Sequence, residues 1–138
     1  MLEALAVLAL LAAAENSVPR AKVKITQKHL VAVCLDGAAV NTRERKWRLE
    51  VRPHAVTFTM GKDSVRAGYA TVRFTAEVGH EYEIEARAAA TTFSRRVWER
   101  GDWKPVVRDR TTNRIVSDEP EWSESTCPPA PTPAPPSI

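Results

Sequence analysis

One stretch of the sequence carries the residue types that bind sugars and anions. Between residues 93 and 104, tryptophans are interleaved with basic side chains around a Gly-Asp turn. Exposed aromatic rings beside guanidinium groups stack on sugars or bases and attract anions. The candidate ligand-binding residues in this stretch are Arg95, Arg96, Trp98, Arg100, Trp103 and Lys104.

The same stretch also has a purely structural interpretation. Trp98 and Trp103 flank the turn at Gly101-Asp102, so they can cover the two sides of a hairpin core while the arginines face water. We favour this second interpretation. No ribonucleoprotein signature, helix-turn-helix or zinc-finger pattern accompanies the segment, so nucleic acid is not an expected partner.

No residue pattern in the chain predicts catalysis. The serines lack the G-x-S-x-G context that exposes a nucleophile, and Cys34 is expected to be buried, which makes a thiol inert. Glu81, Glu83 and Glu85 alternate along the chain and most simply form the solvated face of one strand. We therefore predict that the protein is not an enzyme. A hydrolase whose carboxylates are paired only in space stays an alternative.

The three histidines do not have the spacing of metal ligands. His29, His54 and His80 show neither i,i+2 nor i,i+4 spacing, and no Cys pair accompanies them, whereas a zinc site requires several converging ligands. His54 and His80 each lie beside a predicted turn, where capping or surface exposure is the ordinary outcome. We expect no metal and no cofactor.

Cys34 and Cys127 are the only cysteines in the chain. In an oxidising compartment they are expected to form a disulfide that joins the start of the C-terminal tail to an early strand. Closing a loop of this length would contribute about 4 kcal/mol in the chain-entropy model. The alternative is a buried free thiol at Cys34 and an unpaired Cys127.

The N-terminus has the features of a signal peptide. Residues 2–14 form an apolar run with one acid, Glu3, and end in three alanines that suit signal peptidase. The run is too short to span a bilayer, so we predict no transmembrane span. We assign residues 1–14 to a leader that is removed before Glu15, although no basic residue precedes the apolar run. The alternative is a short helix that packs on the domain.

The C-terminus is a proline-rich tail, which we assign to residues 123–138. Six of the ten prolines follow Cys127, which excludes helix and favours extended polyproline II. A stiff spacer or a disordered tail is the expected role. The PxxP spacing within the tail leaves a partner with a proline-binding groove as an alternative.

Residues 15–122 form the predicted domain, and their hydrophobic period is two. Such alternation indicates strands with one buried and one wet face. The run from His29 to Leu35 is more continuously apolar, as in a strand covered on both faces. The apolar members of the alternating runs are Val23 and Ile25; Trp47, Leu49 and Val51; Val56, Phe58 and Met60; Val72, Phe74 and Ala76; Tyr82, Ile84 and Ala86.

Turn signals divide these runs into about eight short strands. Asp36-Gly37, Pro53, Gly79-His80 and residues 111–113 each end or separate a run, and residues 61–68 form a polar loop. One helical turn is expected at most, at residues 88–92. The predicted fold is all-β, a small antiparallel β-sandwich of seven or eight strands.

The order of these features resembles a known type of bacterial domain. A strand ends in Asp36-Gly37, another enters through residues 52–56, and the segments 74–82 and 107–116 follow. Over residues 31–117 the chain resembles the small exported β-sandwich domains of the PEGA-like or transthyretin-like type. Those domains usually show Pro-Gly-x-His at the second feature, whereas here Pro53 runs directly into His54. The resemblance implies a structural or binding module of the cell envelope, of unknown ligand.

The sequence thus predicts a non-enzymatic exported module of the bacterial cell envelope, periplasmic or secreted, that contacts a protein or a cell-wall component. The alternative is a carbohydrate- or polyanion-binding domain that uses the hairpin between Trp98 and Trp103. A formal net charge of +3 and a pI near 9.1 fit a polyanion or glycan partner, but net charge alone concerns solubility and encounter rates.

Overall fold

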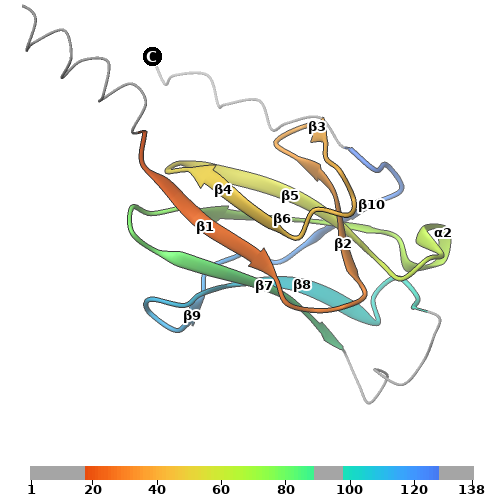
Figure 1. Cartoon of the computed structure of the whole chain (residues 1–138). Helices are drawn as coiled ribbons and strands as arrows, with labels where there is room; N and C mark the ends of the chain where they lie inside the picture. The colour runs from red at the N-terminus through yellow and green to blue at the C-terminus, as the bar shows by residue number, and fades with distance from the viewer. Residues whose placement is uncertain (1–17, 89–97, 128–138) are drawn as a thin grey trace, which may run out of the picture.

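The computed structural model describes residues 18–88 and 98–127, which form two packed β-sheets (Figure 1). Sheet A contains, in order across the sheet, β4 (Lys46–Glu50), β1 (Arg20–Ile25), β7 (Glu81–Ala88), β8 (Trp103–Asp109) and β9 (Arg114–Ile115). Sheet B contains β10 (Glu121–Ser123), β6 (Tyr69–Thr75), β5 (Pro53–Met60), β2 (Leu30–Leu35) and β3 (Ala38–Ala39). The predicted all-β sandwich is therefore confirmed.

The core lies between the two sheets and follows the predicted alternation. In β1, Ala21, Val23 and Ile25 are buried, while the residues between them are exposed. The inner faces of β5 and β6 contribute the buried side chains at alternate positions of both strands. The largest fully buried side chains of the core are Trp103, Tyr82, Phe58, Leu30, Met60, Ile84, Val23, Val56, Val72 and Val107.

The strand pairing differs from the prediction at one place. All described pairs are antiparallel except β1 with β7, which pair in parallel. In addition, Pro53 and Gly79-His80 do not turn the chain within a sheet. Pro53 takes the chain from sheet A to β5 of sheet B, and Gly79-His80 takes it from β6 back to β7 of sheet A.

Three smaller elements also depart from expectation. A single helical turn, α2 (Ser64–Ala67), lies in the predicted polar loop, and the Asp63 side chain accepts from the Arg66 amide at its start. The helical turn expected at residues 88–92 lies mostly outside the described residues, and Ala88 ends β7. Side chains of β2 alternate between buried and half-buried, so the strand is less fully covered than predicted.

A β-bulge in β2 decides where Cys34 points. The register with β5 shifts between Ala32 and Cys34, so that Cys34 is opposite Thr57. Opposite residues of an antiparallel pair share a face, and Thr57 lies on the outer face of sheet B because its neighbours Val56 and Phe58 are in the core. The bulge therefore directs Cys34 away from the core, to the outside of sheet B.

On this outer face Cys34 forms the predicted disulfide with Cys127. Because β10 pairs with β6 at the other side of the sheet, the chain between Ser123 and Cys127 has to cross β6 and β5 to reach Cys34. Thr57 and Thr71 are buried on the same face and their hydroxyls bond to each other at 2.7 Å. The outer face of sheet B is thus partly covered by the chain's own C-terminal segment.

The predicted leader and most of the predicted tail lie outside the described residues. β10 and the disulfide show that the folded part continues beyond residue 122 to Cys127. A disulfide is compatible with an oxidising, extracellular location. Among residues 18–88 and 98–127, no helix is long and apolar enough to cross a membrane.

Candidate functional site

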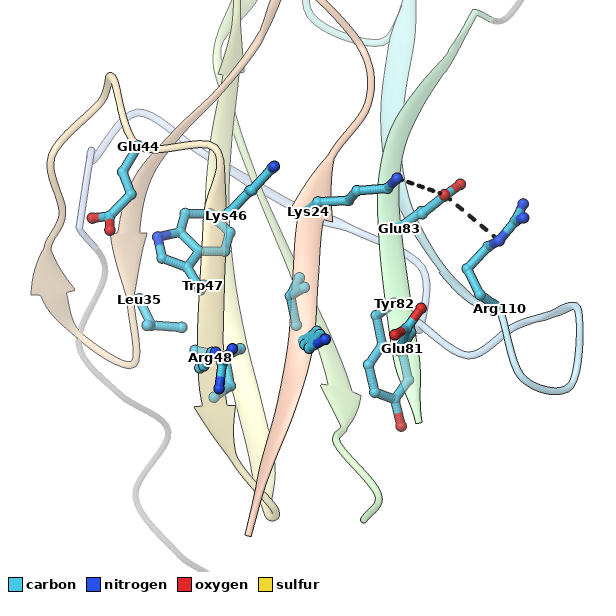
Figure 2. Close-up of a pocket in the computed structure, with 13 residues that line it drawn as sticks. Lys24, Leu35, Glu44, Lys46, Trp47, Arg48, Glu81, Tyr82, Glu83 and Arg110 are labelled. Atoms are coloured by element: carbon cyan, nitrogen blue, oxygen red, sulfur yellow. Dashed lines mark ion pairs between the residues drawn. The ribbon is translucent and has the colours of Figure 1, made fainter. Parts of the chain in front are cut away.

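The outer face of sheet A carries a strip of basic side chains. The inward positions of β1 and β4 alternate with outward ones, and the outward ones are mostly lysine and arginine. Together with parts of β7 these residues line a hollow of about 880 Å³ (Figure 2). We call the following residues the basic strip: Arg20, Lys22, Lys24, Lys46 and Arg48.

The register of β1 and β4 places like charges opposite one another. Lys22 is opposite Arg48, and Lys24 is opposite Lys46. Like charges directly opposite in a sheet repel and destabilise the pairing. Within the described ranges, Lys22, Lys46 and Arg48 make no ion pair, whereas Lys24 pairs with Glu83 at 3.4 Å. Arg20, the remaining member, is opposite Glu50 and does not line the hollow, whereas Glu44 and Glu81 do. Positive charge without an ion-pair partner in the described residues is therefore concentrated on Lys22, Lys46 and Arg48.

The carboxylates of β7 limit the strip on one side. Glu81 and Glu83 are beside Lys22 and Lys24 in the parallel register. Figure 2 shows that Glu83 is shared between Lys24 and Arg110, whose guanidinium Nε lies 3.6 Å from the carboxylate. Glu85 is likewise engaged, with Arg108 at 3.3 Å and Arg87 at 3.8 Å. Most of this negative charge is thus compensated by arginines of β7, of β8 and of the turn after β8.

The predicted binding stretch lies elsewhere, and its two tryptophans are buried. Trp98 is 4% exposed and Trp103 is 1% exposed, and the indole Nε1–H of Trp103 donates to the Ala67 carbonyl at 3.1 Å. Both rings belong to the core, as the structural interpretation of the stretch expects. Trp98 does not lie in a strand and β8 pairs with β7, whereas residues 93–97, which make up most of the first arm of the predicted hairpin, lie outside the described residues. The hairpin around Gly101-Asp102 therefore stays a prediction.

The remaining candidates of that stretch are only partly brought together. Arg95 and Arg96 lie outside the described residues. The Arg100 guanidinium lies 6.0 Å from the ring centre of Trp122, and Lys104 pairs with Glu119 at 3.3 Å. Ligand binding by these side chains stays a prediction.

Trp122 was not among the candidates, yet it is the aromatic ring beside these cations. It lies on β10, is partly exposed, and meets the Trp103 ring edge-to-face with centroids 5.0 Å apart. β10 has only three residues, too few for alternation to be recognised. In the sequence, only its being a tryptophan marks Trp122 as a possible ligand-binding residue.

His54 is buried, so of the two expected outcomes, capping or surface exposure, surface exposure is wrong. Its Nδ1 lies 2.6 Å from Asp36 Oδ2 and its Nε2 lies 2.7 Å from the Glu50 carbonyl oxygen. The ring therefore links the Asp36 carboxylate to the main chain at Glu50. Asp36 has a positive φ of 50° and also accepts from the Ala55 amide at 2.8 Å. The network fixes the turn after β2 to the start of β5.

His80 belongs to a second network, with the buried Asp109 and the exposed Glu77. The ligand atoms of these three side chains lie within 4.8 Å of one another, which is a possible arrangement for a metal ion. Asp109 is already fully engaged, because Oδ2 lies 2.6 Å from His80 Nδ1 and Oδ1 accepts from the amides of Thr111 and Thr112. The cluster therefore needs no cation to hold it together, and we assign it a structural role at the hairpin between β8 and β9.

Asp109 is expected to make the protein sensitive to acid. Burial raises the pKa of this carboxyl, but the hydrogen bonds from His80 and from the two threonine amides outweigh burial and lower its pKa below 3.8. A lowered pKa in the folded state stabilises the fold above pH 3.8, and this contribution is lost as the pH falls through the lowered value. Urea unfolding of the native protein and of Asp109→Asn should differ clearly at pH 7, and the difference should shrink at acid pH as the Asp109 carboxylate becomes protonated. An equal difference at both pH values would contradict this role.

Comparison with protein-family models, with curated proteins and with solved structures finds no match to this chain. The PEGA-like or transthyretin-like resemblance therefore stays a prediction. The fold and the site together define a disulfide-bonded β-sandwich. The outer face of its sheet A presents the basic strip beside β7 carboxylates, most of which form ion pairs.

Proposed function

We propose that this protein is an exported, non-enzymatic binding module that binds an anionic polymer through the basic strip. The observation that carries the proposal is the pairing of Lys22 with Arg48 and of Lys24 with Lys46 across β1 and β4. Such pairs weaken the sheet in the free protein. A bound anion between them would turn repulsion into two attractions.

The shape of the strip favours a polymer over a single small anion. Arg20, Lys22 and Lys24 succeed one another on one face of β1, and the two outer members are separated by about 13 Å at about 3.3 Å per residue. One small anion would compensate one row of this strip only. A chain with repeated negative charges would compensate both like-charge rows and also reach Arg20. β4 is the edge of sheet A, so the approach from that side is not blocked by another strand of the sheet.

Export is supported by the Cys34–Cys127 disulfide, because such bonds persist in oxidising compartments. A leader at residues 1–14 and the resemblance to exported envelope domains agree with a periplasmic or secreted protein of the bacterial envelope. The proposed ligand is therefore an acidic polymer of the cell wall or cell surface. The absence of enzymatic activity is part of the proposal and is supported by the structural engagement of His54 and Asp109.

Arg48→Glu provides the test, because binding and stability should change in opposite directions. The substitution places a carboxylate opposite Lys22, so the cross-strand repulsion becomes an attraction and the free energy of unfolding should rise slightly, by about 0.5 kcal/mol. Retention on immobilised heparin should fall, and the slope of log affinity against log salt should decrease by about one or more. Urea unfolding and salt elution measure the two effects.

Arg114→Glu is the matched control. Arg114 is exposed on β9, at the opposite end of sheet A, and the charge change is the same. This control should elute close to the native protein. If Arg114→Glu and Arg48→Glu lose retention equally, binding depends on net charge alone and the strip is not a site. If Arg95→Ala/Arg96→Ala abolishes retention while Arg48→Glu does not, the ligand binds at the originally predicted stretch instead.

A further inference from the structure

A second, smaller hollow lies away from the basic strip, where β8 of sheet A approaches β10 of sheet B. Its volume is about 350 Å³, enough for one sugar ring, and Trp103 and Trp122 form part of its wall. β7 separates β8 from β1, so this hollow and the strip are distinct surfaces. Its other main lining residues are Arg87, Lys104, Glu119 and Pro120.

The aromatic wall is held in a fixed orientation. Trp103 is fully buried and anchored through its indole N–H to the Ala67 carbonyl. Trp122 meets that ring at an interplanar angle of 77°, and Arg100 lies over its ring. A partly exposed indole that is already oriented loses little conformational freedom when a ligand packs on it. The C–H face of a pyranose is an apolar surface that suits such a ring.

The rim supplies a donor and an acceptor side by side. Lys104 Nζ and Glu119 Oε1 lie 3.3 Å apart, and the Glu119 side chain is 86% exposed. Two neighbouring hydroxyls of a sugar match this pair, since one accepts from the ammonium group while the other donates to the carboxylate. A ligand that carries only acceptors, such as phosphate, would be repelled by Glu119.

Arg87 adds a positive charge to the lining of the hollow. Its Nε lies 3.8 Å from Glu85 Oε1, and the side chain is about half exposed. A guanidinium has five N–H donors and binds carboxylates with two of them in parallel. The terminal nitrogens of Arg87 are thus suited to a carboxylate on the same sugar ring.

From these contacts we propose that the hollow binds one hexuronic acid unit, a pyranose that carries a carboxylate. The ring packs against Trp122, two vicinal hydroxyls bond to Lys104 and Glu119, and the carboxylate bonds to Arg87. The site does not depend on the basic strip. An acidic polysaccharide could bind to both the basic strip and this hollow. In that case the anionic polymer of the proposed function would be a glycan.

The test uses two probes that differ only in the carboxylate, methyl β-D-glucuronide and methyl β-D-glucoside. Nuclear magnetic resonance follows the indole N–H signals of the four tryptophans, with the Trp122 signal assigned from the Trp122→Phe variant. The glucuronide should shift the Trp122 signal in a saturable manner at millimolar concentrations, and the glucoside should bind about tenfold more weakly, because it lacks the charge-assisted bonds.

Exposed rim residues provide variants that keep the fold. Glu119→Gln should weaken both probes severalfold, and Arg87→Gln should abolish the preference for the glucuronide. Lys62→Gln, a charge removal on an exposed loop after β5, should change neither. Arg48→Glu should also leave the Trp122 titration unchanged, which separates this site from the basic strip.

Three outcomes would overturn the proposal. The first is no shift of the Trp122 signal with either probe, and the second is identical titrations for the native protein and for Glu119→Gln and Arg87→Gln. The third is a larger Trp122 shift with adenosine monophosphate than with the glucuronide, which would assign the ring to nucleobase stacking instead of a sugar.

Discussion

The Cys34→Ser/Cys127→Ser double variant is expected to unfold with a free energy about 4 kcal/mol below that of the native protein. The bond joins residues 93 positions apart, so it closes a long loop and removes many conformations from the unfolded chain. A domain of this size is stabilised by about 5–15 kcal/mol in total, so the loss is a large fraction. Urea unfolding with linear extrapolation measures the difference.

Reduction provides the matching control. Native protein treated with dithiothreitol should lose the same free energy as the double variant, and the double variant should not respond to dithiothreitol. Within the folded state the effect should be largest at β10, because β10 pairs with β6 through three residues only and the disulfide follows it directly. Amide exchange should therefore accelerate most at residues 121–123. A double variant as stable as the native protein would show that core packing alone fixes the C-terminal segment.

The strands were predictable because alternation is a local property. β1, β4, β5, β6 and β7 each show the period of two in their own few residues, and each forms where that period predicts. Which sheet a strand joins is not local. Pro53 and Gly79-His80 mark turns correctly, but the residues at a turn do not state whether the chain re-enters the same sheet or crosses to the other.

The same distinction explains what was found and missed at the site. Lys22, Lys24, Lys46 and Arg48 are visible in the sequence as the polar members of alternating runs. Only the register between β1 and β4, more than twenty residues apart, reveals that they form like-charge pairs. Alternation alone assigns them to a solvated face, which is the ordinary role of such residues.

Cys34 and His54 show how one irregularity redirects a side chain. Continuous alternation from Leu30 would place Cys34 in the core, but the bulge after Ala32 moves it to the outer face, where Cys127 reaches it. His54 follows Pro53 at the start of β5, where the sequence predicts either capping or surface exposure. Asp36, from the turn after β2, provides the carboxylate that allows its burial.

Trp103→Ala is expected to reduce the free energy of unfolding by about 3–5 kcal/mol. The substitution removes a fully buried indole from the core and with it the hydrogen bond that the indole N–H donates to the Ala67 carbonyl. It also leaves Trp122 without its edge-to-face partner. Trp103→Phe keeps most of the ring but loses the N–H donor, so it should reduce the free energy of unfolding by less. The expected reduction is about 1–3 kcal/mol, the cost of leaving one buried carbonyl without a hydrogen-bond partner. Urea unfolding of both variants measures the two contributions.

Trp103→Phe also separates the two interpretations of the stretch between residues 93 and 104. If Trp103 serves the core, the variant should be less stable and yet bind heparin like the native protein, because the basic strip is on other strands. If the ring contacts the polyanion directly, retention should fall in proportion to the lost ring contact, even at temperatures far below the unfolding transition. A side chain that is 1% exposed offers a ligand very little contact area, so we expect the first result.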